Sequence, residues 1–334
     1  MATTLTDVLQ WLLEGDPSIR WQVMRDLLDA PEEQWQAERR RVEHEGWGAE
    51  LLAHEDPEGT WAGGACYPGD FSRALFEAEG QPWTATLNVL SDLTAYGLEP
   101  TTDRAREMVR LIGENGIWEY DRLPYWGGEV EECINGRTVA AGAYFGVDMA
   151  PLVERLLTER QADGGWNCER ANGSTRSSFH STIDVLEGLL EWEVQTGGTD
   201  ASRAARAAGE EFLLERRLSR RLSTGEVADP DFLQLGFPWR WHYTTLRGLD
   251  HLRRAGIHAG TPPDARAREA IDHLRRRQGA DGRWLLEWQP RGRVWFEMEP
   301  VGMPSRWVTL IALRILRWWE GFRDQGNLNA WVVP

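Results

Sequence analysis

The sequence contains no lysine, and all 37 of its basic residues are arginine. Without a lysine amine, the chain cannot form a Schiff base with a carbonyl substrate or with pyridoxal phosphate, and it cannot complete a P-loop nucleotide site. Its three cysteines, Cys66, Cys133 and Cys168, are too few for a framework of disulfides. No apolar run reaches the roughly 18 residues that would predict a transmembrane helix.

The residues Met1 to Thr6 carry no basic charge, so we expect no signal peptide and a cytoplasmic location. The formal net charge of −16 argues against nucleic acid and anionic membranes as partners. We expect instead a small-molecule substrate, with a protein partner or a homo-oligomer as further alternatives.

Tryptophan, by contrast, is abundant, with 19 residues. Four of them follow glycine in a recurring turn, namely Trp61, Trp118, Trp166 and Trp284. The turns are roughly 50 to 60 residues apart, and the last gap is about twice as long. We therefore expect one degenerate copy around Gly225, where no tryptophan follows. A period of this length predicts a repeat of helical hairpins that bury their apolar faces against one another.

Apolar residues three and four positions apart predict helices along most of the chain. The predicted helices cover residues 83–96, 101–113, 137–147, 150–160, 178–193, 202–217, 240–255, 264–277 and 305–321. A short hairpin over 285–299 is the only β-structure that we expect. Residues 1–45 lack the turn and predict an N-terminal helical extension before a domain of residues 46–334. About five to six hairpins closing on themselves give an all-α fold, an α/α toroid with a central cavity.

The turns and their place between helix pairs resemble those of the squalene–hopene cyclase and protein prenyltransferase β-subunit superfamily, over residues 46–322. The resemblance implies a toroid that acts on a hydrophobic, isoprenoid substrate in an aromatic-lined cavity. The chain departs from the protonation-initiated cyclases, because it lacks their Asp-x-Asp-Asp motif. Its nearest sequence, Asp229-Pro230-Asp231, is typical of a helix N-cap, so squalene chemistry is not expected.

A second resemblance concerns zinc. Prenyltransferase β subunits hold zinc with an Asp-x-Cys pair at the start of one inner helix and a histidine at the start of the next. Residues 131–133 resemble the pair, with glutamate in place of aspartate, and residues 178–182 resemble the histidine segment. The implied ligands are Cys133, Cys168 and His180, with Glu131 as a fourth ligand or an orienting residue. Such a set also satisfies the preference of zinc for three or four sulfur, nitrogen and oxygen ligands.

The remaining candidate residues surround this segment. With Glu131, the candidates for catalysis are His242 and Tyr243, and His242 is also a spare metal ligand. The residues expected to line the cavity are Tyr67, Tyr125, Trp126, Trp239, Trp241 and Tyr243. The arginines nearest the site, which would hold a diphosphate, are Arg137, Arg176 and Arg240. Three alternatives remain open: a non-catalytic binder of an apolar ligand in the same cavity, a metal-free protein similar to terpene cyclases, and a scaffold whose toroid is filled by side chains.

Overall fold

The computed structural model describes residues 4–321, and in this part of the chain the regular structure is helical. The α-helices are α1 (Leu5–Leu13), α2 (Pro17–Asp26), α3 (Glu32–Arg40), α4 (Gly46–Ala53), α5 (Arg73–Glu79), α6 (Thr86–Tyr96), α7 (Asp103–Asn115), α8 (Glu132–Tyr144), α9 (Ala150–Thr158), α10 (Phe179–Thr196), α11 (Asp200–Glu215), α12 (Thr245–Ala259), α13 (Arg268–Arg276) and α14 (Arg306–Gly321). Short 3-10 turns are η1 (Arg41–Glu43), η2 (Tyr125–Gly127), η3 (Cys168–Asn172), η4 (Pro230–Leu233) and η5 (Ala265–Ala267). The all-α prediction is therefore confirmed for these residues. None of the described helices is both long and apolar enough to span a bilayer.

Side chains just before several helices fix where those helices begin. Asp16 accepts a hydrogen bond from the Ser18 N–H at 2.8 Å, and Pro17 occupies the first helical position of α2. Thr199 and Ser202 form a reciprocal capping box at the start of α11. Such caps satisfy backbone N–H groups that have no partner inside the helix.

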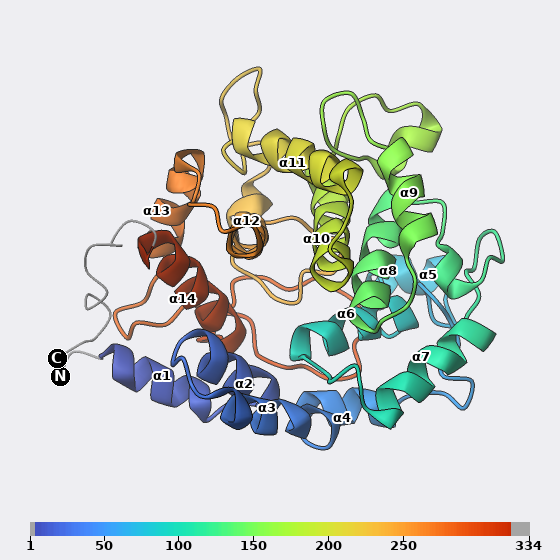
Figure 1. Cartoon of the computed structure of the whole chain (residues 1–334), viewed down its shortest axis with the longest axis horizontal. Helices are drawn as coiled ribbons and strands as arrows, with labels where there is room; N and C mark the ends of the chain where they lie inside the picture. The colour runs from blue at the N-terminus through green and yellow to red at the C-terminus, as the bar shows by residue number, and fades with distance from the viewer. Residues whose placement is uncertain (1–3, 322–334) are drawn as a thin grey trace.

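Six helices form a closed circuit of contacts. Helix α2 packs against α6, α6 against α8, α8 against α10, α10 against α12, α12 against α14, and α14 against α2 again. In Figure 1, α7, α9, α11 and α13 lie outside α6, α8, α10 and α12. Helices α8 and α10 meet backbone to backbone, because a Cβ on Gly188 would lie 2.3 Å from the carbonyl oxygen of Gly136.

The circuit closes between α2 and α14 through polar groups. The buried guanidinium of Arg314 donates to Gln22 Oε1 at 2.6 Å and pairs with the carboxylate of Asp26. Helix α2 also contacts α4 and α6, so part of the predicted N-terminal extension lies within the circuit. The domain boundary after residue 45 stays a prediction.

Three of the four glycine–tryptophan turns share one pattern of hydrogen bonds. The indole N–H donates to the carbonyl of a leucine ten residues earlier, at 2.7 to 2.8 Å. The backbone N–H of the same tryptophan donates to a threonine hydroxyl in the next inner helix, at 3.0 to 3.1 Å. The three sets are Trp61 with Leu51 and Thr86, Trp166 with Leu156 and Thr182, and Trp284 with Leu274 and Thr309. Each tryptophan thus ties the end of an outer helix to the start of an inner one. Trp118 departs from the pattern and donates to the carbonyl of Tyr125.

The expected degenerate copy is a turn around Gly225, whose φ of 72° is in the left-handed region. A bridge between Arg220 and Val227 closes this turn. In place of an indole, the hydroxyl of Tyr243 donates to the carbonyl of Leu218, just after α11, at 2.7 Å. A tyrosine from beyond the turn therefore satisfies a carbonyl at the end of this outer helix.

The hairpin expected over 285–299 is wrong. Leu285 forms an isolated bridge with Pro304, and the Leu286 N–H donates to the carbonyl of Met303. Pro290, in the middle of the expected hairpin, has no N–H to donate to a ladder. Residues 285–286 therefore pair with the residues just before α14, and residues 287–288 pair with residues 235–236.

We expect Trp166→Phe to lower the free energy of unfolding by about 1 to 3 kcal/mol, because the buried Leu156 carbonyl loses its donor. Trp166→Ala should cost more, about 3 to 5 kcal/mol, since it also leaves a cavity. Urea unfolding followed by circular dichroism measures both. The control is Tyr120→Phe, at a side chain that is 73% exposed, which should change stability by less than about 0.5 kcal/mol. A Trp166→Phe protein as stable as the wild type would show that the indole hydrogen bond does not hold the turn.

Candidate metal centre

Glu131, Cys133 and Cys168 bring one ligand atom each into a group within 4.8 Å. Glu131 is the residue before the first turn of α8, Cys133 lies in that turn, and Cys168 opens η3. The turn at Trp166 places Cys168 there, because the tryptophan is tied through Thr182 to α10, which packs on α8. The side chain of Asn167 then accepts from the Glu169 N–H and starts η3.

A chain of hydrogen bonds runs through the group. The Ser181 hydroxyl donates to Cys168 Sγ at 3.3 Å, the Cys168 thiol to Cys133 Sγ at 2.8 Å, and the Cys133 thiol to Glu131 Oε2 at 3.5 Å. The backbone N–H of Cys133, at the start of α8, also points at Cys168 Sγ, at 3.3 Å. N–H and O–H donors of this kind, at a helix N-terminus, stabilise negative charge on sulfur.

The hydrogen bond with Cys168, together with burial, raises the pKa of the Cys133 thiol well above its usual range. This thiol is therefore protonated at neutral pH when no cation is near, and a bound cation would release the proton. The separation of 2.8 Å between the sulfurs exceeds the ~2.0 Å of a disulfide. It is shorter than the roughly 3.8 Å between two thiolates on one tetrahedral zinc.

Two sulfurs and a carboxylate oxygen nevertheless fit zinc in their chemistry, since zinc accepts all three kinds of donor. A shift of about 1 Å between the sulfurs is needed for both to bind the same ion. Both cysteine side chains are only half-buried, and Cys168 lies in a short 3-10 turn, so rotation about their Cα–Cβ bonds can supply it.

His180 lies in the first turn of α10 but outside this group of three. Its Nδ1 accepts a hydrogen bond from the Tyr243 N–H at 2.8 Å, and its ring meets Phe232 and Trp241 edge to face. Burial lowers the pKa of His180 to about 4, so the imidazole is neutral at pH 7. The structure thus brings together three of the four expected ligands, and the role of His180 stays a prediction.

The candidates for catalysis on the loop before α12 have other partners. His242 stacks on Trp241 with ring centroids 3.7 Å apart, and its Nδ1 lies 3.2 Å from the Trp239 carbonyl oxygen. Burial, assisted by the neighbouring His180, lowers the pKa of His242 to about 4. The hydroxyl of Tyr243 is bonded to the Leu218 carbonyl, which gives it a structural task.

The expected cavity wall divides into two groups. Tyr125 is fully buried and stacked on Trp118, so it has no surface facing a water-sized cavity. Half-buried are Tyr67, which contacts Phe71, and Trp126, Trp239 and Trp241. The indole of Trp241 donates to Gln81 Oε1 at 3.0 Å.

The expected cations also differ from one another. Arg176 is exposed. Arg240 pairs with Asp92 of α6 at 2.8 Å, so its charge is already balanced. Arg137, in α8, is buried.

Buried ion pairs that the sequence did not reveal join the inner helices. Arg247 of α12 binds Asp184 at 2.5 Å and Glu187 at 2.6 Å, both from α10. Burial raises the pKa of Asp184 to about 7. One available signal was spacing, because Asp184 lies one helical turn after His180 and therefore on the same face. The sequence gives no sign that Arg247 is its partner.

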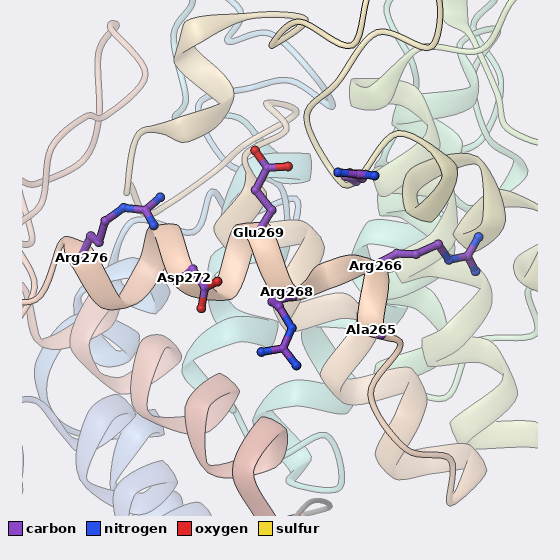
Figure 2. Close-up of a pocket in the computed structure, with 7 residues that line it drawn as sticks. Ala265, Arg266, Arg268, Glu269, Asp272 and Arg276 are labelled. Carbon is purple, nitrogen blue, oxygen red and sulfur yellow. The ribbon is translucent and has the colours of Figure 1, made fainter.

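Two surface hollows lie away from the group of Glu131, Cys133 and Cys168. One, of about 480 Å³, is on the outer helix α13 and the adjoining η5. Figure 2 shows Arg266, Glu269, Asp272 and Arg276 along this helical run. Arg266 pairs with Glu211, and Glu269 with Arg220, so these charges are already matched. A smaller hollow is lined by Phe71, Leu75, Glu79, Gly80, Pro82 and Arg293. None of the three candidate ligands lines either hollow.

Comparison with known proteins does not assign the chain to a family. No protein-family model matches the chain, and no curated protein matches it either. The interpretation of the centre therefore depends on the chemistry of its own residues.

We expect acid to destabilise the fold partly through His242. Its pKa is about 4 when folded against an ordinary value of 6.5, so between these values the unfolded chain binds more protons and stability falls as the pH falls. Allowing for partial exposure of the ring, the loss between pH 7 and pH 5 is about 1 kcal/mol. His242→Gln keeps an amide donor for Trp239 but does not titrate.

Urea unfolding of both proteins at pH 7 and pH 5 measures this effect. The wild type should lose about 1 kcal/mol more than His242→Gln on acidification. His258→Gln, at an exposed position, serves as the control and should lose as much unfolding free energy between pH 7 and pH 5 as the wild type does. Equal losses in the wild type and in His242→Gln would show that the fold does not hold His242 neutral.

Proposed function

We propose that this chain is a zinc-dependent enzyme of the α/α-toroid type, related to the squalene–hopene cyclase and protein prenyltransferase β-subunit superfamily. The observation that carries the proposal is the convergence of Glu131, Cys133 and Cys168 within 4.8 Å at the start of an inner helix. The closed circuit from α2 to α14 supports the toroid. A zinc ion with three protein ligands and an open position acts as a Lewis acid that activates a thiol or a water.

The protein's own residues prepare this centre. Glu131 accepts a hydrogen bond from the Cys133 thiol, and Ser181 and the start of α8 hold Cys168 in place. The two positive charges of zinc would offset most of the negative charge of two thiolates and a carboxylate.

The substrate that we propose is hydrophobic, in keeping with an isoprenoid, and carries a polar group. The half-buried indole of Trp241 supplies aromatic surface next to His180, and that of Trp239 lies over the Arg247 guanidinium. Glu131 is exposed and the two cysteines are half-buried, and a purely apolar ligand over them would remove their water without replacing its hydrogen bonds. This observation favours an enzyme with an amphipathic substrate over a non-catalytic binder of an apolar ligand or a metal-free cyclase.

The sulfur separation of 2.8 Å favours one second candidate, a redox-active dithiol. Oxidation of Cys133 and Cys168 by oxidised glutathione would form a disulfide and release two molecules of reduced glutathione. A zinc centre and a disulfide exclude each other, because zinc needs both thiolates.

Zinc content separates these functions. We expect close to one zinc per chain by plasma mass spectrometry of protein purified without a histidine tag, and loss of most of it in Cys133→Ala and in Cys168→Ala. Cys66→Ala is the matched control, because Cys66 is buried and lies outside the group, and it should keep its zinc. His180→Ala tests the fourth ligand, and a loss equal to that of Cys133→Ala would place His180 in the coordination shell.

Two results would contradict the zinc proposal. One is a wild-type protein without metal even after zinc is added under reducing conditions. The other is zinc that remains in both cysteine variants. Loss of two titratable thiols with oxidised glutathione, in a protein that takes up no zinc, would establish the dithiol instead.

A further inference from the structure

Arg137 differs from the other buried arginines of residues 4–321. Four arginine residues in this part of the chain are buried as a whole, namely Arg137, Arg206, Arg247 and Arg314. Arg206 pairs with glutamates, Arg247 with Asp184 and Glu187, and Arg314 with Asp26. Arg137 has no carboxylate within 4.0 Å among the residues that the structure describes. A buried charge without a counter-charge is strongly unfavourable, so its persistence calls for a partner.

The contacts of Arg137 are to neutral groups only. Its Nη2 donates to Asn88 Oδ1 at 2.8 Å and to Ser91 Oγ at 3.1 Å, both on α6. Over the described range, Nε and Nη1 have no hydrogen-bond acceptor. The Nδ2 group of Asn88, on the same amide that accepts from Arg137, is also buried and without a partner. A buried amide donor without an acceptor therefore lies beside the Arg137 guanidinium, whose Nε and Nη1 remain accessible to water or to a ligand.

The charges around Arg137 limit how much negative charge can be accommodated there. Arg240 is neutralised by Asp92, and Arg247 by Asp184 and Glu187. Burial lowers the pKa of Arg137, and the charge of Asp184, which is not in contact with it, offsets part of this effect, while Arg240 and Arg247 lower the pKa further. The vicinity thus offers one positive charge that lacks a contacting partner, which matches a monoanion better than a diphosphate.

The position of Arg137 links this unpaired charge to the metal group. Arg137 follows Cys133 by four residues in α8, so the two side chains lie on one face of the helix, one turn apart. Both α6 and α10 pack against α8 there. A ligand held by Arg137 and Asn88 would therefore be next to Glu131, Cys133 and Cys168.

We propose that Arg137 and Asn88 bind a carboxylate group of the substrate beside the metal centre. This inference rests on the proposed function for the neighbouring zinc and for the hydrophobic part of the substrate. It selects Arg137 among the three candidate cations and replaces the diphosphate that they were expected to hold. The carboxylate supplies a contacting counter-charge, which no residue of 4–321 provides.

Calorimetric titration with dodecanoate tests the proposal, with dodecanol as the probe that lacks the charge. We expect the wild type to bind dodecanoate, and Arg137→Gln to bind it at least tenfold more weakly, while dodecanol binding is the same in both. Arg137→Lys keeps the charge and should recover part of the affinity. Inorganic diphosphate is titrated separately, and it should bind the wild type more weakly than dodecanoate does.

Asn88→Asp provides a second test that does not remove the arginine. The new carboxylate would replace the Asn88 amide that Arg137 already contacts at 2.8 Å, so it would take the place of the ligand. We expect this variant to melt at a higher temperature than the wild type and to lose dodecanoate binding. Gln34→Glu, at an exposed position of α3, should change neither property.

Unchanged dodecanoate binding in folded Arg137→Gln, or in Asn88→Asp, would overturn the inference. So would equal losses for dodecanoate and dodecanol, or Arg137-dependent binding of diphosphate that is tighter than that of dodecanoate. Zinc content of the same samples keeps the two proposals apart. If dodecanoate binding depends on Arg137 but the protein contains no zinc, only the proposed metal function is wrong. If the protein contains one zinc per chain but dodecanoate binding does not depend on Arg137, only the carboxylate site is wrong.

Discussion

The inner helices from α2 to α14 cover one another's apolar faces only if the circuit closes, and the contact between α2 and α14 closes it. The seam is polar, with Arg314 buried between Gln22 and Asp26. A buried guanidinium accepts few alternative arrangements, because the loss of its hydrogen-bond partners costs more free energy than the loss of contacts costs an apolar side chain. The seam therefore sets how α14 lies against α2. Through α14 it also positions α12, which carries Arg247 to the acidic residues of α10.

Much of the helical organisation was predictable, because it depends on local patterns. Helix α14 runs from Arg306 to Gly321, against a prediction of 305–321. The glycine–tryptophan turns marked the helix ends, although the leucine carbonyl and the threonine that each indole joins were not foreseen. Helix α12 begins five residues later than expected, since Arg240 has a φ of 56°, which no helix accepts, and Thr244 caps the helix instead. Residues that pair far along the chain, such as Leu285 with Pro304, gave no periodic signal.

The candidate site was predictable where the sequence brought its members to helix starts. Glu131 and Cys133 are at the start of α8, and Cys168 follows the turn at Trp166, so their convergence depends on two packed helices and one turn. The hydrogen bond from Ser181 and the partner of Arg247 depend on distances between elements, which no local pattern encodes. Among residues 4–321, Arg137 contacts no carboxylate, and this is less predictable still, because it becomes apparent only when the other buried arginines are matched with their carboxylates.

The seam between α2 and α14 also has a consequence for synthesis. Residues 17–26 leave the ribosome long before residues 306–321, so Gln22 and Asp26 lack Arg314 as a partner while the intervening helices are made. Contacts between such distant segments form slowly, because the entropy of closing a long loop precedes any gain from packing. The nascent protein therefore exists for a time as an open arc of hairpins with the inner face of α2 exposed, and it closes only after α14 has been made. Exposed apolar surface of this kind is what chaperones recognise. The apolar face of α2 stays exposed until α14 has been synthesised.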